Sequence, residues 1–471
     1  MEKHSLILGM GTSGQSVARH LSRLGLPFAA ADTRDDAALR ADWLAQYPEV
    51  CVTMGALPES LLDNVGELIV SPGIALDLPL IISARAKQIP VRGDIDLALH
   101  ATDLPVVLIT GSNGKSTVTA LVGELLNAVG VSAAVGGNFG TPALDLLATD
   151  AQVLVLEVSS FQLESTDFDS LPAARRPVAA TVLNISQDHL DRHGTLAHYA
   201  AIKETVLHKA RCAAMNRDDP MVVAMAERAS GEVIRFGTAT PTQPGDFGLM
   251  TIAGESWLVQ AAANAPALRI LPVHELALAG QHNQMNVLAA LALVQAAVPG
   301  VALTDERLLN VLRTFSGLPH RAQTVGVIDG VRYIDDSKAT NVGAAVAAIV
   351  GMQPPLVLIA GGQGKGQDFT ALAESLVGRC AGVVLLGQDQ AVIAEALLNQ
   401  PGATWPVRRV NSMIEAVKAA SEIAPPQSTV LLAPACASLD MFVSYVDRGH
   451  QFAAAVASLS AKQANGTEVT S

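Results

Sequence analysis

Short apolar runs alternate along the chain with longer stretches in which alanine and leucine recur at helical spacing. The runs are SLILG (5–9), PFAAAD (27–32), ELIVSPG (67–73), VVLIT (106–110), AQVLVLEV (151–158), AATVLN (179–184), RYIDD (332–336), LVLIAGG (356–362), GVVLLG (382–387) and TVLLAPA (429–435). Apolar runs that end in glycine or polar turns are typical of buried strands, and intervening helices indicate parallel sheets. The pattern therefore predicts an α/β protein built from βαβ units.

The glycine turns divide this pattern into three blocks, with predicted domains at 1–95, 96–317 and 318–471. The first block ends near GDIDLALHATDLP (93–105), and the third begins near FSGLPHR (315–321). The stretch 215–275 of the middle block is less regular and contains one short strand pattern, WLVQ (257–260). A chain of 471 residues is long enough for several domains, each with its own core.

Charge and cysteine content exclude several classes of protein. The chain has 31 basic and 44 acidic residues, which argues against nucleic acid as the main partner and against a polybasic membrane contact. Its four cysteines are widely spaced without a CxxC pair, so neither a disulfide framework nor a thiolate metal cluster is indicated. No signal-peptide pattern precedes the first strand, and the apolar run VLAALALV (287–294) is too short to cross a bilayer. We expect a cytoplasmic protein without membrane insertion.

The stretch PVVLITGSNGKSTVTALVGELL (105–126) runs from a strand through a glycine turn into a helix, as a phosphate-binding loop does. It is a shortened variant, because only Ser112 and Asn113 separate Gly111 from Gly114. Backbone N–H groups at the helix N-terminus and the charge of Lys115 are suited to a phosphate. Two hydroxyls follow as candidate Mg²⁺ ligands, Ser116 and Thr117.

A metal ligand is expected near such a loop. The next strand, VLVLEVSS (153–160), carries Glu157 where an acidic Mg²⁺ ligand would follow an apolar run. The later loop TVLNISQDHLDRHG (181–194) contains His189 and His193 at the spacing of a zinc helix, but leucine follows His189, so the general base of that motif is missing. A single His189 ligand to a second Mg²⁺ is favoured over zinc, and a hydrogen-bonded loop histidine stays open.

The N-terminus supports a competing interpretation. Gly9, Gly11 and Gly14 form the G-x-G-x-x-G fingerprint of a dinucleotide site, and Asp32 ends the next strand. A second strand-end turn spans Ser71 to Gly73. Three hypotheses follow: an NAD(P)-dependent oxidoreductase, an ATP-driven enzyme whose first domain holds another diphosphate ligand, and a nucleotide-hydrolysing switch protein.

The third block favours an enzyme with a small carboxylate ligand. Lysines and hydroxyls lie at its strand ends, in IDDSKATN (334–341), LVLIAGGQGKGQDF (356–369) and LLAPACASLDMFVSY (431–445). The carboxyl ends of parallel strands share one sheet edge, where ligands bind in α/β folds. Cations and hydroxyls gathered there suit a carboxylate.

The motifs GSNGKST, LEVSSFQLE, DHLDRH, GQHNQMN, GLPHR, DSKATN and PACASLD, in this order, resemble those of the Mur ligase family across essentially the whole chain. The resemblance implies a Rossmann-like N-terminal domain that binds the UDP substrate, a central P-loop ATPase-like domain and a Rossmann-like C-terminal domain that binds the amino acid. It implies peptidoglycan precursor synthesis, with D-glutamate joined to UDP-N-acetylmuramoyl-L-alanine through an acyl phosphate. ATP and two Mg²⁺ ions would be used, ADP and phosphate would be released, and we expect a monomer.

The resemblance also assigns roles to individual residues. Catalytic roles fall on Lys115, His189 and Lys203, and the matching lysine of the family is carbamylated; sequence alone would place Lys203 on a helix surface. Metal ligation is implied for Ser116, Glu157, His189 and carbamylated Lys203. ATP binding is implied for Gly111, Ser112, Asn113, Gly114, Lys115, Ser116, Thr117, Asn286, Arg321 and Asp336. UDP-substrate binding is implied for Thr12, Ser13, Gly14, Asp32, Thr33, Arg34, Ser71, Gly73 and Asn138. D-Glutamate binding is implied for Thr340, Lys365, Ser438 and Tyr445. Two positions depart from the pattern of relatives: Gln363 stands where some carry aspartate, and Tyr445 where others carry phenylalanine.

Overall fold

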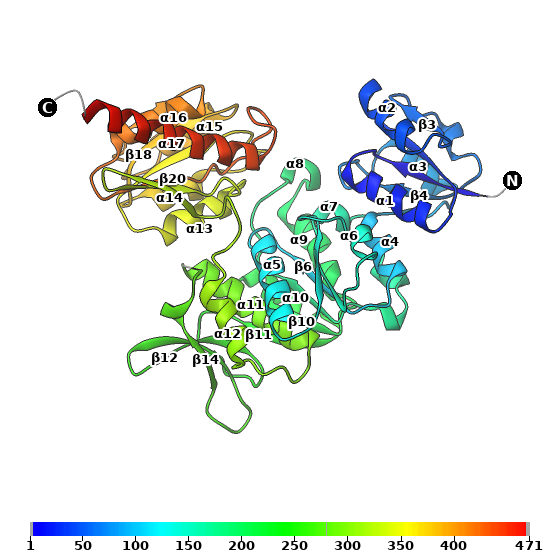
Figure 1. The fold of residues 1–471 in the computed structure, drawn as a ribbon, viewed down its shortest axis with the longest axis horizontal. Coiled ribbons are helices and arrows are strands. Elements are labelled where there is room, and N and C mark those ends of the chain that lie inside the picture. The colour runs from blue at the N-terminus through cyan, green and yellow to red at the C-terminus, as the bar shows by residue number, and fades with distance from the viewer. Residues whose placement is uncertain (1–2, 279, 468–471) are drawn as a thin grey trace. The chain divides into compact units, whose positions relative to one another are not determined.

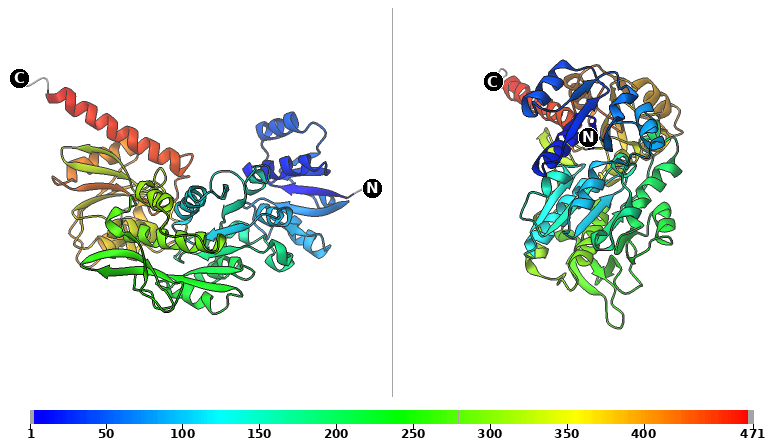
Figure 2. Two further views of the ribbon diagram at one scale, coloured as in Figure 1. Left: turned by 60° about the horizontal axis from the view of Figure 1, so that its bottom comes forward. Right: turned by 90° about the vertical axis from the view of Figure 1, so that its right-hand side faces the viewer.

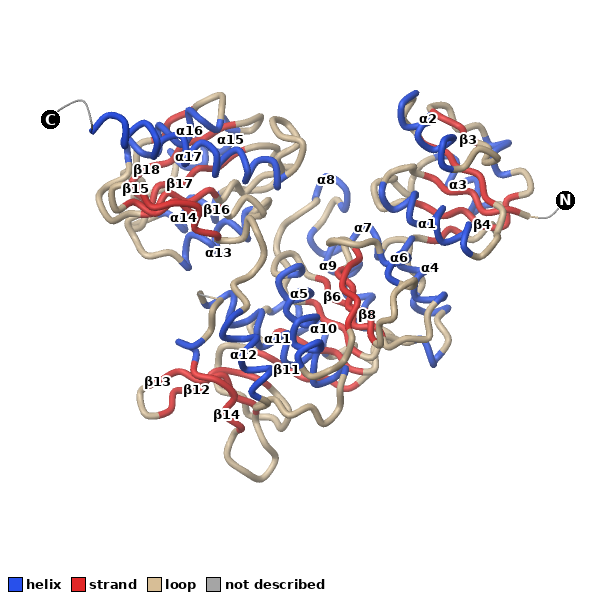
Figure 3. Tube along the Cα trace, in the orientation of Figure 1, coloured by secondary structure: helices blue, strands red, loops and turns tan. Residues whose placement is uncertain are grey.

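Three β-sheets, each covered by helices, form the mixed α/β architecture that the sequence predicts (Figure 1). The structure is a computed structural model that describes residues 3–278 and 280–467. Figure 3 shows the alternation of strands and helices along the chain. None of the helices among the described residues is long and apolar enough to span a membrane.

The first sheet is parallel and has the order β3-β2-β1-β4-β5. Its strands are β1 His4–Leu8, β2 Phe28–Asp32, β3 Val52–Met54, β4 Val65–Val70 and β5 Val91–Arg92. Its helices are α1 Thr12–Arg23, α2 Ala37–Gln46, α3 Pro79–Ala86 and α4 Asp94–Ala101. Leu6 and Leu8 face one core while Ile7 faces the other, as the two-residue period of a strand covered on both sides requires.

The second sheet has the order β14-β13-β12-β11-β10-β9-β6-β8-β7. The strands are β6 Val106–Thr110, β7 Ala133–Gly137, β8 Val153–Glu157, β9 Ala179–Val182, β10 Cys212–Asn216, β11 Glu232–Phe236, β12 Phe247–Ile252, β13 Glu255–Gln260 and β14 Leu268–Pro272. The helices along this part of the chain are α5 Lys115–Ala128, α6 Ala143–Leu146, α7 Ser160–Leu163, α8 Leu190–His193, α9 Leu196–Glu204, α10 Pro220–Ala226, α11 Gln281–Ala297 and α12 Glu306–Thr314. Strands β6 and β8 are buried along their whole length, which accounts for their continuous apolar sequence.

The stretch that the sequence pattern left irregular is an antiparallel extension of this sheet, β12-β13-β14. The predicted WLVQ strand is confirmed within β13. The turn between β12 and β13 is formed by Ala253 and Gly254, which both have positive φ angles of 52° and 85°. Tight hairpin turns favour this geometry, but alanine at the first position gives none of the usual Asn-Gly or Asp-Gly signal.

The third sheet has the order β15-β16-β20-β17-β18-β19, with β15 antiparallel to its neighbour and the other strands parallel. The strands are β15 Gln323–Ile328, β16 Val331–Asp335, β17 Leu356–Gly361, β18 Cys380–Leu386, β19 Val407–Arg409 and β20 Thr429–Leu432. The helices are α13 Val342–Gly351, α14 Thr370–Leu376, α15 Gln390–Leu398, α16 Met413–Ile423 and α17 Tyr445–Thr467. Helices α13, α14 and α15 share one apolar core with the sheet, and α16 and α17 share the other. Helix α17 is the red helix next to the C-terminus in Figure 2.

The described residues group into two compact units. One contains the first two sheets and comprises the chain up to Ile185, Ala200–Ala277 and Met285–Phe315. The other contains the third sheet and comprises Ser186–Tyr199, Leu278, Gly280–Gln284 and the chain from Ser316 on. The domain boundaries predicted at 95 and 317 stay a prediction.

We predict that Gly14→Ala lowers the free energy of unfolding by about 1–3 kcal/mol, because a methyl group there has no space. A Cβ atom at Gly14 would lie 2.0 Å from the carbonyl oxygen of Gly9. Gly11→Ala is the matched control, because a Cβ atom there meets nothing within 4 Å. Urea unfolding of both variants measures the effect, and equal stability of the two would contradict this close approach.

Candidate functional site

The two N-terminal turns that the sequence singled out meet at one edge of the first sheet. Strands β1 and β4 are neighbours, and the turns that follow them are joined by the Ser71 hydroxyl, which donates to the Gly9 carbonyl oxygen at 2.9 Å. Thr12, Ser13 and Gly14 form the first turn of α1. A glycine turn that leads into a helix N-terminus is suited to a diphosphate, so these turns form one candidate anion site.

Asp32 ends β2 at the same edge, but its carboxylate is already engaged within the chain. Its Oδ2 accepts the Met10 N–H at 2.8 Å, and its two oxygens accept the Arg34 side chain at 2.9 and 2.8 Å. Burial alone would raise the pKa of Asp32, but the Arg34 guanidinium and the N–H groups of Met10 and Arg34 outweigh it and lower the pKa to about 2. Asp32 is therefore ionised and holds the exposed Thr33–Arg34 turn in place. Because its oxygens are already occupied, Asp32 is poorly suited to accept the ribose hydroxyls of a dinucleotide.

The phosphate loop lies between β6 and α5, as the sequence predicts. Gly111 and Gly114 have positive φ angles of 145° and 84°, and Gly114 is the N-cap of α5. The Lys115 ammonium folds back over the loop and donates to the carbonyl oxygens of Gly111 and Ser112, both at 2.9 Å. Ser116 and Thr117 are buried in the first turn of the helix. The lysine charge is thereby held at the helix N-terminus, where anions bind.

Asn286 belongs to the same neighbourhood, although it lies far along the chain on α11. It is buried, and its Oδ1 would be only 2.5 Å from a Cβ atom at Gly114. Glycine is required at position 114 both for this contact and for its left-handed backbone. The structure thus brings Asn286, one of the predicted ATP ligands, against the phosphate loop.

Two further predicted residues, one at a strand end and one on a helix, lie near the end of β6. Glu157 ends β8, and its Oε1 accepts the side-chain amide of Asn138 at 2.9 Å. Lys203 on α9 is 1% exposed, and its Nζ lies 3.2 Å from the Thr110 hydroxyl at the end of β6. Sequence alone placed Lys203 on a helix surface, so its burial is a correction. The helical pattern could not reveal that this face packs against a strand end.

The other unit carries the remaining candidates. Lys365 lies in the turn after β17, and its Nζ forms an ion pair with Asp188 Oδ1 at 2.8 Å. Asp188 Oδ2 accepts the Asn341 amide at 3.2 Å, and Asp188 Oδ1 also accepts the backbone N–H of His189. Lys365 and His189 both have left-handed backbones, with φ angles of 54° and 53°. Such strained positions in residues other than glycine cluster at functional sites.

Lys365 and His189 border a cavity of about 490 Å³. Its lining is His189, Asp191, Gln363, Lys365, Gly366, Gln388, Asp389, Ala437 and Leu439. The volume suits a small-molecule ligand. Of the described residues that were predicted to bind the amino acid, only Lys365 belongs to this lining. Gln388 and Asp389 were not predicted from the sequence, although they follow the strand GVVLLG at a glycine turn, which was the available signal.

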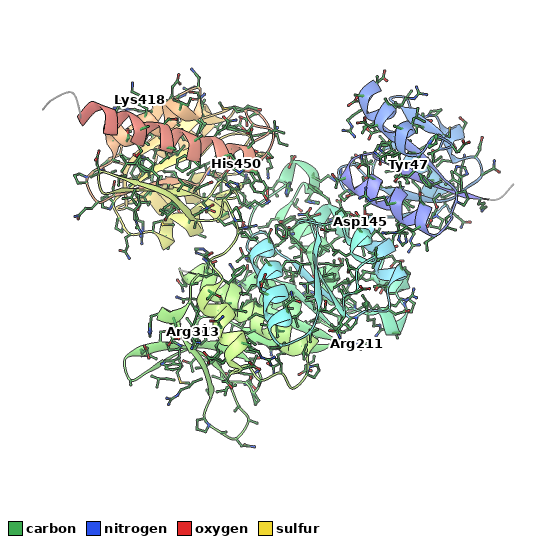
Figure 4. The ribbon with its side chains drawn as sticks, viewed as in Figure 1. Tyr47, Asp145, Arg211, Arg313, Lys418 and His450 are labelled. Carbon is green, nitrogen blue, oxygen red and sulfur yellow. The ribbon has the colours of Figure 1, made fainter. Side chains whose placement is uncertain are left out.

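The loop after β16 holds two adjacent carboxylates in different environments. Asp335 is buried, and its Oδ2 lies 2.7 Å from His320 Nδ1. His320 packs edge-on against His450 at 4.9 Å between ring centroids. Figure 4 labels His450 on α17. Desolvation raises the pKa of the half-buried Asp336 to about 7, with a further rise from Asp335, while Arg321 and the Ala322 N–H oppose the shift. Asp336 and Arg321, both predicted ATP ligands, are therefore brought together.

Arg448 is the main structural residue of this region that the sequence analysis missed. It is 1% exposed, and its guanidinium donates to Ser337 Oγ at 2.9 Å, to the Ser337 carbonyl at 2.8 Å and to the Cys436 carbonyl at 3.1 Å. Ser337 Oγ in turn donates to the Tyr445 carbonyl at 2.8 Å. Burial lowers the pKa of Arg448 to about 10, so the group stays charged at neutral pH.

Arg448 therefore joins three segments that carry predicted amino-acid ligands. These segments contain Thr340, Ser438 and Tyr445, respectively. The Lys338 ammonium lies over the Tyr445 ring at 3.9 Å from its centroid, which adds a cation–π contact to the group. A lone arginine in a helical pattern gave no signal that it would be buried.

Comparisons with known proteins identify the family. Family models match three consecutive regions: the Mur ligase MurD-like N-terminal domain at residues 3–93, the Mur ligase middle domain at 109–294, and the Mur ligase glutamate ligase domain at 320–436. The curated UDP-N-acetylmuramoylalanine--D-glutamate ligase of Pseudomonas aeruginosa is 46% identical over 461 residues, covering 96% of this chain and 98% of the relative. The protein of the same name from Marinobacter nauticus is 45% identical over 454 residues, covering 96% and 97%.

Solved structures with low sequence identity share the fold. The UDP-N-acetylmuramate-alanine ligase MurC of Thermotoga maritima has a TM-score of 0.58 at 18% identity, covering 97% of this chain and 99% of that chain. A Mycobacterium tuberculosis folylpolyglutamate synthase complexed with ADP and AMPPCP has a TM-score of 0.56 at 17% identity, covering 78% and 93%. The chain belongs to the Mur ligase family and is of the MurD type.

Proposed function

We propose that the chain is an ATP-dependent ligase that adds D-glutamate to UDP-N-acetylmuramoyl-L-alanine. A carboxylate oxygen of the UDP substrate attacks the γ-phosphorus of ATP, the bond to the bridging oxygen breaks, and ADP leaves. The D-glutamate amine then attacks the acyl carbon of the resulting acyl phosphate. A tetrahedral intermediate expels phosphate, and the amine proton is released as the amide forms.

The observation that carries this proposal is the convergence of charged groups at one edge of the second sheet. The order β9-β6-β8 places the Lys115 loop beside the strand end that carries Glu157. Lys203 reaches the end of β6 through Thr110. Phosphoryl transfer depends on positioned charge more than on covalent chemistry by the protein, and this edge supplies it. A site that only binds a dinucleotide does not need two lysines and a glutamate gathered at one sheet edge.

The donor types at this edge fit Mg²⁺, which prefers oxygen ligands. Ser116 and Glu157 offer such oxygens directly, and Lys203 offers them only as a carbamate. We propose that these three residues and His189 hold two ions, which would neutralise charge on the transferring phosphoryl group. Lys115 adds a fixed positive charge from the helix N-terminus.

We assign the binding of D-glutamate to the domain of the third sheet. Lys365, Thr340, Ser438 and the Tyr445 backbone would hold the two carboxylates of D-glutamate. The Lys365 ammonium is paired with Asp188, so an incoming carboxylate has to share or displace that partner. Asn286, Arg321 and Asp336 would hold the nucleotide. The choice of D-glutamate rests on the family, because lysines and hydroxyls recognise a carboxylate without naming its amino acid.

The first sheet is assigned to the UDP moiety. The joined turns at Gly9–Gly14 and Ser71–Gly73 would take the diphosphate, and Asp32, Thr33 and Arg34 would lie near the uracil, with Asn138 contacting the substrate in the middle domain. The engagement of Asp32 with Arg34 supports this assignment over a nicotinamide cofactor. We propose that the enzyme acts as a cytoplasmic monomer.

The function is tested by measuring phosphate release from MgATP with UDP-N-acetylmuramoyl-L-alanine and a panel of amino acids that includes D- and L-glutamate. We expect release only when the UDP substrate and D-glutamate are both present. If phosphate release requires a different amino acid, the chain has the activity of another ligase of the family. Absence of release with every amino acid would overturn the proposal.

We predict that Lys203→Ala lowers kcat by about 100-fold or more, because a buried charged group beside the phosphate loop is lost. Added bicarbonate is not expected to restore turnover, since the variant has no amine to carbamylate. Lys209→Ala is the control, because Lys209 is a partly exposed lysine that forms an ion pair with the exposed Asp169. Turnover of Lys203→Ala at the wild-type rate would contradict the role of Lys203.

We predict that MgATP affinity rises by about tenfold as the pH passes upward through about 7, since an ionised Asp336 accepts stronger hydrogen bonds from the ribose. The sign follows from the raised pKa, because the carboxyl group is protonated below about 7 and charged above it. Asp336→Asn should abolish this dependence. Protonation of ATP itself affects wild type and Asp336→Asn equally, so the measured quantity is the ratio of their MgATP affinities at each pH. A ratio that does not change with pH would refute the assignment of Asp336 to the ribose.

A further inference from the structure

Both backbone polar groups of Asn113, in the middle of the phosphate loop, are hydrogen-bonded by a side chain that the proposed reaction does not use. The Asn113 N–H donates to Asn184 Oδ1 at 2.8 Å, and Asn184 Nδ2 donates to the Asn113 carbonyl at 3.1 Å. One amide side chain therefore pairs with both polar groups of one residue, as a neighbouring strand would. The Ser112 N–H adds a third bond, to the Asn184 backbone carbonyl, at 2.9 Å.

Asn184 occupies this place because it follows β9, the neighbour of β6. The Leu183 N–H donates to the Thr110 carbonyl at 2.9 Å, which continues the parallel ladder past the last strand residues. The loop lies flat on this extension: a Cβ atom at Gly111 would be 3.0 Å from Leu183 Cβ. The position of Asn184 is thus set by the sheet itself, which is rigid.

The shortened loop explains why such support is needed. The usual phosphate loop has four residues between its glycines, whereas this one has two. With the N–H groups of Ser112 and Asn113 directed to Asn184, the donors that meet an anion come from residues after Asn113, where α5 begins. Asn184 therefore sets which N–H groups of the loop face a phosphate.

We propose that Asn184 is a positioning residue for nucleotide binding, which acts by holding the Ser112–Asn113 segment of the phosphate loop in its anion-binding form. This inference rests on the proposed use of ATP. It requires an amide at position 184, because an amide side chain offers the one acceptor and the one donor that pair with the N–H and the C=O of Asn113. A carboxylate keeps the acceptor, loses the donor and adds negative charge beside the phosphates.

The test compares Asn184→Leu and Asn184→Asp with wild type. Asn184→Leu removes both side-chain bonds at similar volume, and we expect it to weaken MgATP binding and raise the KM for ATP by about 100-fold, because misplacing a reacting group by an ångström has effects of that size. Asn184→Asp should weaken binding at least as much. Affinity for the UDP substrate should stay unchanged in both variants.

Asn216→Leu is the matched control. The buried Asn216 donates to the Leu183 carbonyl at 2.8 Å, so it supports the adjacent residue without touching the loop. We expect it to lower the melting temperature while leaving the KM for ATP unchanged. Wild-type affinity for MgATP in Asn184→Leu would overturn the proposal. Loss of both UDP-substrate binding and ATP binding would also overturn it, because that result would indicate general damage to the fold. Wild-type protein that binds no MgATP would instead overturn the proposed function.

Discussion

The short turn between Gly111 and Gly114 is the constraint on which the rest of the site depends. It is tight enough that both glycines adopt positive φ angles and that any side chain at Gly114 would strike Asn286. Because β6 is buried along its length, the turn is carried at a fixed point of the sheet edge. Lys115 is held there by two carbonyl oxygens of its own loop. The Lys115 ammonium and the helix N-terminus can then bind a phosphate without rearranging. Electrostatic groups accelerate a reaction most when they are preorganised in this way.

Buried polar groups around this edge and in the third sheet perform the same kind of task. Charged and amide side chains are costly to bury unless their bonding groups are satisfied. The buried Arg448 and Asp32 bear that cost in full and the partly buried Asn184 bears part of it, while their hydrogen bonds tie a loop to a strand or a helix. The loops that carry the candidate ligands are therefore fixed by hydrogen bonds from their neighbours more than by apolar packing. Exposed loops without such bonds would sample many conformations, at the expense of affinity.

Sequence patterns predicted the strands and the strand-end turns well, because burial on both faces leaves continuous apolar runs and turns require glycine. They also predicted that Glu157 lies near the Lys115 loop, and the pairing of β6 with β8 confirms that their strand ends are neighbours. They failed where three-dimensional packing decides the outcome. The burial of Lys203 depends on which helix face meets β6, and the hairpin at Ala253–Gly254 uses a residue that rarely adopts its backbone angle. Arg448 and Asn184 gave no signal because their partners, mostly backbone groups, lie in loops distant in sequence.

We propose that the phosphate loop serves to transfer a phosphoryl group to the carboxylate of the UDP substrate. The most direct test is to label that carboxylate with ¹⁸O, run the reaction with MgATP and D-glutamate, and measure the isotope in the released phosphate by mass spectrometry. Transfer through an acyl phosphate predicts that one carboxylate oxygen leaves with the phosphate, so that label appears there as the amide forms. Amide formation with unlabelled phosphate would contradict the account.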